Sequence, residues 1–399
     1  MRRVVKKIRS RLLLDATLAV VLLSSLGCAT ADLDGFIEED RLSAELRQRG
    51  LDPTQVVVPF LLDDEMRDWI AEIRKYSASP IDRLYLLQAK LLNPKEMSIQ
   101  YQWGYTGTAA EVFRDRKANC LAFTNLFVGM ARELGVEVYF LSVEDAESYR
   151  REGDLVVVSD HIVVGYGSPI DRVIFDFSES AGSKEYRFIH NVSDLTAIAM
   201  FHSNRGAEAL QLGNTDVALD WLRKAVRVDA DLANAWINLG VALRRQGDVS
   251  GAEAAYKKSL EIDPRIYSAY HNLTSLLHAE GRSKEAEAYQ HALARAPSRN
   301  PYTYLSLGDI SFIGGRLDEA EKFYRRAINL DDAIAEGYAA MGQLMISYGD
   351  LRRARRMLRK AEKIETANPR TERLRAMLER QAQTTLDDLA LSHRAQALQ

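Results

Sequence analysis

Hydrophobic and small residues recur every 34 positions over the C-terminal half of the chain. The glycines of this pattern are Gly206, Gly240, Gly308 and Gly342. The alanines are Ala218, Ala252, Ala286, Ala320 and Ala354, and aromatic residues stand four places before the glycine position at Trp236, Tyr270, Tyr304 and Tyr338. Between these positions the apolar residues follow the helical period. The pattern predicts helical hairpins that stack on one another, with small residues where two helices approach closely.

This pattern resembles the tetratricopeptide repeat, which has a 34-residue period with small and aromatic positions of this kind. Five repeats are expected, over residues 199–232, 233–266, 267–300, 301–334 and 335–368, followed by a capping helix and tail over 369–399. The third repeat departs from the pattern with Thr274 at the glycine position, and the first has His202 in place of the aromatic residue. The resemblance implies an all-α solenoid whose groove binds a protein or peptide.

The pattern of the preceding region changes from helical to strand-like after Gly135. Residues 56–100 and 108–134 have apolar positions at helical spacing, with Asn93-Pro94 and residues 116–119 as interruptions. Four short segments rich in Val, Ile, Phe and Tyr then read as strands: Val136–Val143, Leu155–Val158, His161–Tyr166 and Val173–Phe177. Helices followed by a run of strands predict an α+β domain, over residues 56–195.

The first 27 residues predict an export signal. Six basic residues within residues 1–12 precede a short apolar run that ends at Gly27-Cys28. This ending resembles the lipobox of bacterial lipoproteins, which implies lipid attachment at Cys28. By resemblance to the sorting rules of enterobacterial lipoproteins, Ala29 in place of aspartate implies the outer membrane, facing the periplasm. An ordinary signal peptide with a chance cysteine is the alternative, and residues 28–55 are expected to be a tether with one short helix.

Charge excludes one class of partner. Removal of residues 1–27 takes away six basic residues and Asp15, so the formal net charge changes from −3 to −8. Nucleic-acid binding needs a basic face, so no nucleic-acid partner is expected. The expected contacts are a membrane, through the lipid anchor, and a protein or peptide in the repeat groove.

Cys120 is the single cysteine downstream of Cys28, and it precedes a strongly helical run. A thiol at a helix N-terminus meets the positive end of the helix dipole, which stabilises thiolate. His161 and Asp176 follow, 15 residues apart on two predicted strands that a hairpin would bring together. A base and an orienting carboxylate beside a thiol are what nucleophilic catalysis requires.

The segments Thr108–Phe113, Asn119–Phe123 and Ala131–Gly135 resemble the core of the transglutaminase-like superfamily. The resemblance covers about residues 60–190. It implies that Cys120 is the nucleophile, His161 the base and Asp176 the residue that orients His161. Many members have glycine before the cysteine and an aromatic residue soon after the histidine, whereas this chain has Asn119 and Ile162-Val163. These positions shape the approach to the thiol, so the substrate class stays open.

Several alternatives concern the same residues. Free cysteine often only packs in a core, and His190 and His202 are competing bases. Two histidines and a cysteine could bind zinc, although no spacing supports it. The second oxyanion donor, beside the Cys120 N–H group, is open among Gln102, Trp103 and Asn119.

The resemblance implies action on amide bonds of a protein substrate, with hydrolysis by a cysteine-protease-type reaction preferred over transamidation. No metal or other cofactor is predicted, and no EF-hand motif for calcium is visible. The alternative is a catalytically inactive scaffold that uses its repeats for protein–protein interaction.

Overall fold

The computed structural model describes residues 39–76, 79–152, 155–177, 189–264, 266–295, 301–365 and 368–381. The predicted signal peptide and Cys28 lie outside these ranges, as does the irregular end of the third repeat at residues 296–298. The chain divides into two compact units. The first contains residues up to 145 and residues 161–197, and the second contains residues 146–160 and residues from 198 onward.

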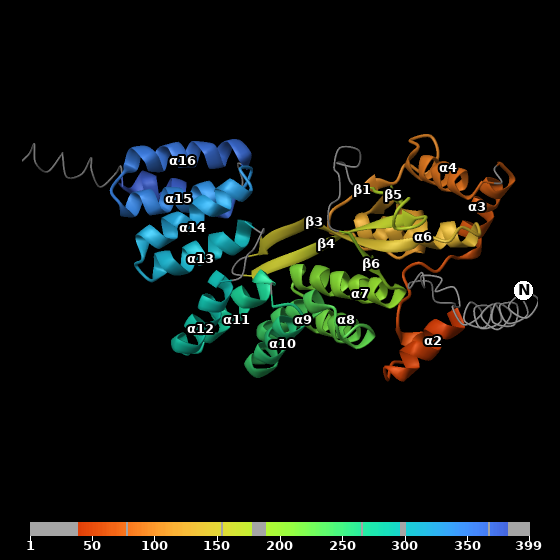
Figure 1. Cartoon of the computed structure of the whole chain (residues 1–399), viewed down its shortest axis with the longest axis horizontal. Helices are drawn as coiled ribbons and strands as arrows, with labels where there is room; N and C mark the ends of the chain where they lie inside the picture. The colour runs from red at the N-terminus through yellow and green to blue at the C-terminus, as the bar shows by residue number, and fades with distance from the viewer. Residues whose placement is uncertain are drawn as a thin grey trace, which may run out of the picture. The chain divides into compact units, whose positions relative to one another are not determined.

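The helices of the first unit precede most of its strands (Figure 1). They are α2 (Glu39–Gln48), the short 3-10 helix η1 (Pro53–Gln55), α3 (Asp64–Tyr76), α4 (Pro80–Leu92), α5 (Ala109–Asp115) and α6 (Cys120–Glu133). Ser79 caps α4 by accepting a hydrogen bond from the Asp82 N–H group, and Pro80 takes the first helical position, where its missing N–H costs nothing. In α2, Leu42 and Leu46 are buried, so residues 39–48 are part of a packed unit and not of a free tether.

The strands form two sheets. In the larger sheet the order is β5 (Val173–Phe175), β4 (Leu155–Tyr166), β3 (Tyr139–Glu152) and β6 (Ile189–Val192). The β3–β6 and β4–β5 pairs are antiparallel. The segments expected as two strands, Leu155–Val158 and His161–Tyr166, form the single strand β4. A second sheet, of β1 (Gln100–Tyr101) and β2 (Lys117–Ala118) in parallel, was not predicted, nor was β6.

Helix α6 forms the centre of the first unit. Every residue from Cys120 to Ala131 is buried, which explains why this stretch is apolar except for Thr124 and Asn125. The ring of Phe127 stacks on Phe175, and the ring of Phe123 stacks on Phe177 with centroids 4.1 Å apart. At the far end of α6, Arg132 forms a two-pronged ion pair with buried Asp194, with both N–O distances 2.8 Å. A buried carboxylate needs such a partner.

The helices of the second unit run as antiparallel pairs (Figure 1). They are α7 (Asp194–Gln211), α8 (Thr215–Val228), α9 (Ala233–Gln246), α10 (Val249–Ile262), α11 (Tyr267–Ala279), α12 (Ser283–Arg295), α13 (Pro301–Ile313), α14 (Leu317–Leu330), α15 (Ala335–Ser347) and α16 (Leu351–Ile364). Residues 369–381 are also helical. In the described part of the chain, no helix combines the length and the apolar composition that a membrane span requires.

Gly240 and Gly308 lie where two helices of one pair touch. A Cβ atom on Gly240 would lie 2.5 Å from the ring of Tyr256, and one on Gly308 would lie 2.4 Å from the ring of Tyr324. All five alanines of the 34-residue pattern are fully buried. These contacts are the physical reason for the pattern, because a larger side chain would separate the helices.

The apolar core of the repeats is divided. One cluster contains buried residues from Ala209 to Ala286, and another contains buried residues from Leu305 to Leu378. Tyr270, Leu293 and Leu307 form a separate small cluster. The division falls at the third repeat, in which Thr274 replaces the expected glycine.

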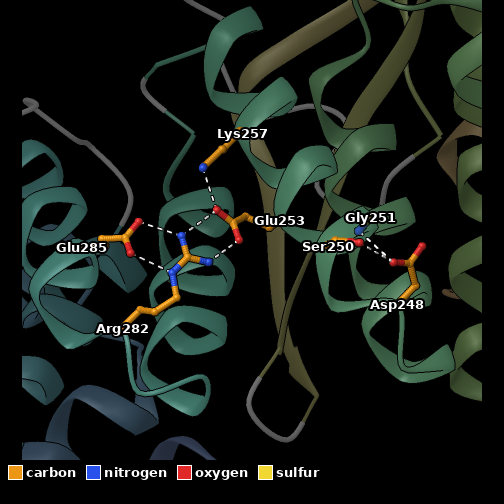
Figure 2. Close-up of polar contacts among 7 residues, drawn as sticks. All are labelled: Asp248, Ser250, Gly251, Glu253, Lys257, Arg282 and Glu285. Atoms are coloured by element: carbon orange, nitrogen blue, oxygen red, sulfur yellow. Dashed lines mark hydrogen bonds and ion pairs between the residues drawn. The ribbon is translucent and has the colours of Figure 1, made fainter.

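Charged side chains join the second and third repeats (Figure 2). Arg282, just before α12, donates two hydrogen bonds to Glu253 of α10 and two to Glu285 of α12. Lys257 lies one helical turn after Glu253, with its Nζ 2.6 Å from a carboxylate oxygen. Glu253 therefore has a cation from each of two repeats.

Candidate functional site

The turn before α6 fixes the position of Cys120. The side-chain oxygen of Asn119 accepts a hydrogen bond from the Ala122 N–H group at 2.8 Å, which caps the helix. The Asn119 amide donates to the Thr106 hydroxyl, also at 2.8 Å, and the Asn119 N–H group donates to the Tyr105 carbonyl. Cys120 is consequently the first residue of α6, at the positive end of the helix dipole.

His161 and Asp176 come from adjacent strands. His161 lies on β4, and Asp176 directly follows β5. Val164 pairs with Phe175 at the end of the ladder, so the chain leaves the sheet beside the part of β4 that carries His161. The Nε2 atom of His161 lies 3.1 Å from Oδ2 of Asp176. The predicted side-by-side placement of these two residues is therefore present.

The structure brings Cys120, His161 and Asp176 together. Burial alone lowers the pKa of His161, but hydrogen bonds with Asp176 and Cys120, and the negative charges of both groups, raise it to about 9. Each of the three residues exposes 9% of its surface. Water is thus largely excluded around the imidazole, and a charged imidazole is stabilised by its two neighbours.

Thr124 is a site-forming residue that the sequence analysis missed. Its hydroxyl donates a hydrogen bond to the Ile162 carbonyl at 3.1 Å, which ties α6 to β4 at the residue after His161. Thr124 is buried, and it lies one helical turn after Cys120 on the same face of α6. The available signal was a polar residue four positions after the cysteine in a mostly apolar helix, a signal that the neighbouring Asn125 shares.

The competing histidines lie in other places. His190 is an exposed residue of β6, where it pairs with Ser142. His202 is buried in α7, with its ring near those of Phe201 and Trp221. The carboxylate of Asp176 pairs with His161. Over the ranges that the structure describes, no group of three or more His, Cys, Asp and Glu residues is arranged to hold a metal ion.

The three candidate oxyanion donors differ in their surroundings. Asn119 uses its side-chain oxygen for the helix cap and its amide for Thr106, so it serves the turn. Gln102 and Trp103 follow β1, with the Gln102 N–H group bonded to the Ala118 carbonyl. The second oxyanion donor, beside the Cys120 N–H group, therefore stays open among Gln102, Trp103 and Asn119.

The arrangement is chemically suited to activating a thiol. The imidazole of His161 is hydrogen-bonded to Cys120, so it is placed to accept the thiol proton, as nucleophilic catalysis requires. Asp176 occupies one ring nitrogen of His161 and thereby orients the other.

Comparison with known proteins identifies the repeat region. Models of the tetratricopeptide repeat match residues 204–265 and 276–339, and a further one matches residues 255–288. The predicted repeats are confirmed over residues 204–339, a region suited to protein–protein interaction. No curated protein matches the sequence.

Solved structures similar to this chain are also repeat proteins. PilF of Pseudomonas aeruginosa is 22% identical, with 46% of this chain and 84% of that chain covered and a TM-score of 0.39. TTC0263, a thermophilic repeat protein of Thermus thermophilus, is 23% identical, with coverages of 45% and 97% and a TM-score of 0.38. YrrB, described as having an unusual peptide-binding site, is 18% identical, with coverages of 45% and 92% and a TM-score of 0.32.

Proposed function

We propose that the first unit is a transglutaminase-like thiol enzyme that acts on amide bonds, with Cys120, His161 and Asp176 as its catalytic triad. The observation that carries this proposal is the placement of His161 between a thiol at a helix N-terminus and a carboxylate 3.1 Å from its Nε2 atom. A cysteine that only packs in the core needs no histidine bonded to its thiol, and no carboxylate bonded to that histidine.

In the proposed reaction, the Cys120 thiol transfers its proton to His161, and the thiolate attacks the carbonyl carbon of an amide. The amine leaves with the proton held by His161, and a thioester remains on Cys120. Water then adds to the thioester with His161 as base, which releases the acid and restores the thiol. If an amine attacks instead, the product is a new amide. Hydrolysis is the proposed outcome.

We assign the repeats to binding the protein substrate or a partner. Tetratricopeptide repeats suit protein–protein interaction, because their stacked hairpins form an extended concave surface. A repeat groove holds a protein at high effective concentration near a second site on the same chain. Binding in the groove would therefore favour attack on amide bonds of the bound protein over those of a free peptide.

The second candidate function is an inactive scaffold in which the repeats alone act. The observation that favours it is that only 9% of the surface of Cys120 is exposed. A packed thiol that no reagent reaches would be a core residue.

The proposed location is the bacterial outer membrane, facing the periplasm, with a lipid on Cys28 after removal of residues 1–27. The basic start, the apolar run and the Gly27-Cys28 end support it. Incorporation of labelled fatty acid in cells should occur with the native chain and be lost with Cys28→Ser. Incorporation that persists in this variant would refute lipidation at Cys28.

The test of the enzyme proposal is the rate of alkylation of Cys120 by iodoacetamide as a function of pH. The chain from Ala29 onward has Cys120 as its one thiol and keeps every described element. An ordinary cysteine titrates near a pKa of about 8.5. An activated thiol should react rapidly at pH about 6, and His161→Ala should abolish that fast reaction.

The alternative outcomes separate the two functions. If labelling is slow in both proteins, or follows an unshifted pKa in both, the enzyme proposal fails and the scaffold function stands. If labelling is fast and depends on His161, release of amine from a mixture of peptides then distinguishes hydrolysis from amine transfer.

A further inference from the structure

Helix α16 is the second helix of the fifth repeat. Its formal charge differs from that of the second helices of the other four repeats. It contains seven cations, namely Arg352, Arg353, Arg355, Arg356, Arg359, Lys360 and Lys363, and one acid, Glu362, which gives a formal charge of +6. The whole chain has a formal charge of −3. The basic charge is therefore concentrated on one 14-residue helix.

The equivalent helices of the other repeats are balanced. Helix α8 has three cations and two acids, α10 and α12 have two of each, and α14 has three of each. Their formal charges are therefore +1, 0, 0 and 0, against +6 for α16. A repeat fold needs no basic helix at this position, so the charge of α16 requires a separate explanation.

The cations of α16 cover one side of the helix. Arg352, Arg356, Arg359 and Lys363 follow one another at intervals of four, three and four residues, so they form one row about 16 Å long. All four are exposed. On the opposite side, Ala354 and Ala361 are fully buried against the rest of the repeat.

The four residues of this row form no ion pair within the described part of the chain, whereas two other charged residues of α16 do. Arg353 pairs with Asp350, and Glu362 pairs with Arg375. Like charges three and four residues apart repel one another, so the unpaired row destabilises the helix. Binding of an anion would remove this repulsion.

We propose that the row Arg352, Arg356, Arg359 and Lys363 docks on the anionic phospholipid headgroups of a membrane. Guanidinium groups bind phosphate oxygens through two parallel hydrogen bonds, and three of the four residues are arginine. Ile364, at the end of the helix, is an exposed large apolar side chain that fits the boundary between headgroups and acyl chains. Helix α16 contains no aromatic residue for stacking on bases.

The choice of lipid over other polyanions rests on the proposed anchor at Cys28, which would hold the chain beside a membrane. A lipid chain at the N-terminus and a basic row near the C-terminus would supply the two signals that stable membrane attachment requires. Docking through α16 would then restrict the orientation of the repeats at that surface.

Co-sedimentation with vesicles tests the proposal, using the chain from Ala29 onward so that no anchor contributes. The comparison is between phosphatidylcholine vesicles with and without phosphatidylglycerol, at ~0.1 M salt. We expect binding to the vesicles that contain phosphatidylglycerol and none to phosphatidylcholine alone. Each cation near an anionic surface strengthens binding roughly 5-fold, so replacing all four by glutamine should weaken it by several hundred-fold.

A matched control removes the same charge elsewhere on the repeats. Arg223, Arg227, Lys284 and Lys322 are exposed residues of α8, α12 and α14, and replacing them by glutamine should leave most of the binding. Arg352→Lys, Arg356→Lys and Arg359→Lys together should also retain binding. Circular dichroism melting of each variant shows whether it is folded.

Several results would overturn the proposal. They are absence of binding to phosphatidylglycerol, equal loss in the α16 and control variants, or binding to RNA or an acidic polypeptide without binding to vesicles. The protein used in this test starts at Ala29 and lacks Cys28, so a failure to bind vesicles would not contradict lipidation at Cys28. Fatty-acid labelling tests lipidation separately.

Discussion

The Nε2 atom of His161 lies 3.1 Å from Oδ2 of Asp176, and both side chains are almost completely buried. The carboxylate holds the imidazole in one orientation, and the neighbouring thiol lies within hydrogen-bonding reach of the same ring. The consequences concern both the stability of the protein and the reactivity of Cys120.

The first prediction is that stability falls as pH rises through the titration of His161. The pKa of His161 is raised to about 9 from an ordinary value of 6.5, so the folded state holds this proton more tightly than the unfolded chain. The contribution is fully present below pH 6.5 and is lost as pH rises through about 9, a loss of ~3 kcal/mol in the free energy of unfolding.

Urea unfolding at pH about 6 and about 9.5 measures this loss, since ΔG falls linearly with denaturant. In Asp176→Asn the imidazole lacks its main charged partner, so the difference between the two pH values should shrink. Equal differences in the two proteins would contradict the assigned cause.

We expect the helix cap of α6 to affect both the stability of the protein and the proposed reactivity of Cys120. Asn119→Ala removes the acceptor for the Ala122 N–H group and the donor to Thr106, and should cost about 1–2 kcal/mol in the free energy of unfolding. Asn119→Asp keeps the cap acceptor, so it should retain more stability. Its negative charge disfavours thiolate at Cys120, so alkylation at pH about 6 should slow. Unchanged alkylation in Asn119→Asp would argue against a thiolate beside this turn.

We expect Thr124 to act as a positioning residue for the proposed site. Thr124→Val leaves the Ile162 carbonyl without the threonine hydroxyl that donates to it, which should cost about 1–3 kcal/mol. We also expect about a 10-fold slower alkylation of Cys120 at pH about 6, because small displacements of reacting groups have large effects. Thr124→Ser keeps the hydroxyl and should restore the rate. If alkylation is equally slow in Thr124→Ser and Thr124→Val, the Thr124 hydroxyl does not position the site.

The period of 34 residues was sufficient to predict the repeats, because Gly240 and Gly308 face aromatic rings with which an added Cβ atom would clash. The strand pattern located β4 and β5, but β1 and β2 have two residues each, which is too short for any periodicity. Their position depends on contacts far along the chain. The single strand β4 replaced two predicted strands because Ser159 and Asp160, which look like a turn, lie within the strand.

The site could be predicted only in part. The types and spacing of Cys120, His161 and Asp176 were visible in the sequence, and their proximity depends on one ladder between β4 and β5. The contact between the Asn119 amide and the Thr106 hydroxyl was not visible, because the two residues are 13 positions apart in the sequence. The same residue that departs from the family pattern before the cysteine is the residue that caps α6.

The network in Figure 2 predicts a loss of stability in acid. Hydrogen bonds from Arg282, and then from Lys257, lower the pKa of Glu253 to about 2 from 4.5. Its contribution is therefore fully present above pH 4.5 and is lost as pH falls toward 2. Glu253→Gln should lower the free energy of unfolding at neutral pH by ~1–2 kcal/mol and weaken its dependence on acid.

Glu285→Gln is the matched control for Glu253→Gln. Glu285 binds the same arginine but is more exposed, with 54% of its side chain accessible against 15% for Glu253. The control should have little effect, because exposed ion pairs contribute little. If Glu285→Gln lowered the free energy of unfolding more than Glu253→Gln, the more buried ion pair would not be the more stabilising one.

Substitution by alanine at the helix contact should lower the free energy of unfolding by different amounts in different repeats. Gly308→Ala places a Cβ atom 2.4 Å from the ring of Tyr324, so it should destabilise by about 1–3 kcal/mol. Thr274→Ala, at the equivalent position of the third repeat, creates no such clash and should cost less. Thermal unfolding of both variants measures the difference, and equal costs would show that the aromatic contact is not the cause.

The division of the repeat core at the third repeat limits how far unfolding propagates. A solenoid unfolds as one block only while neighbouring units are coupled strongly. Among the described residues, the two large apolar clusters are separate, and the small cluster of Tyr270, Leu293 and Leu307 lies across the division between them. Amide hydrogen exchange should therefore separate two groups of amides, with one shared opening free energy on each side of this division. The array would then behave as two cooperative segments in series, and force or a protease could open one while the other stays intact.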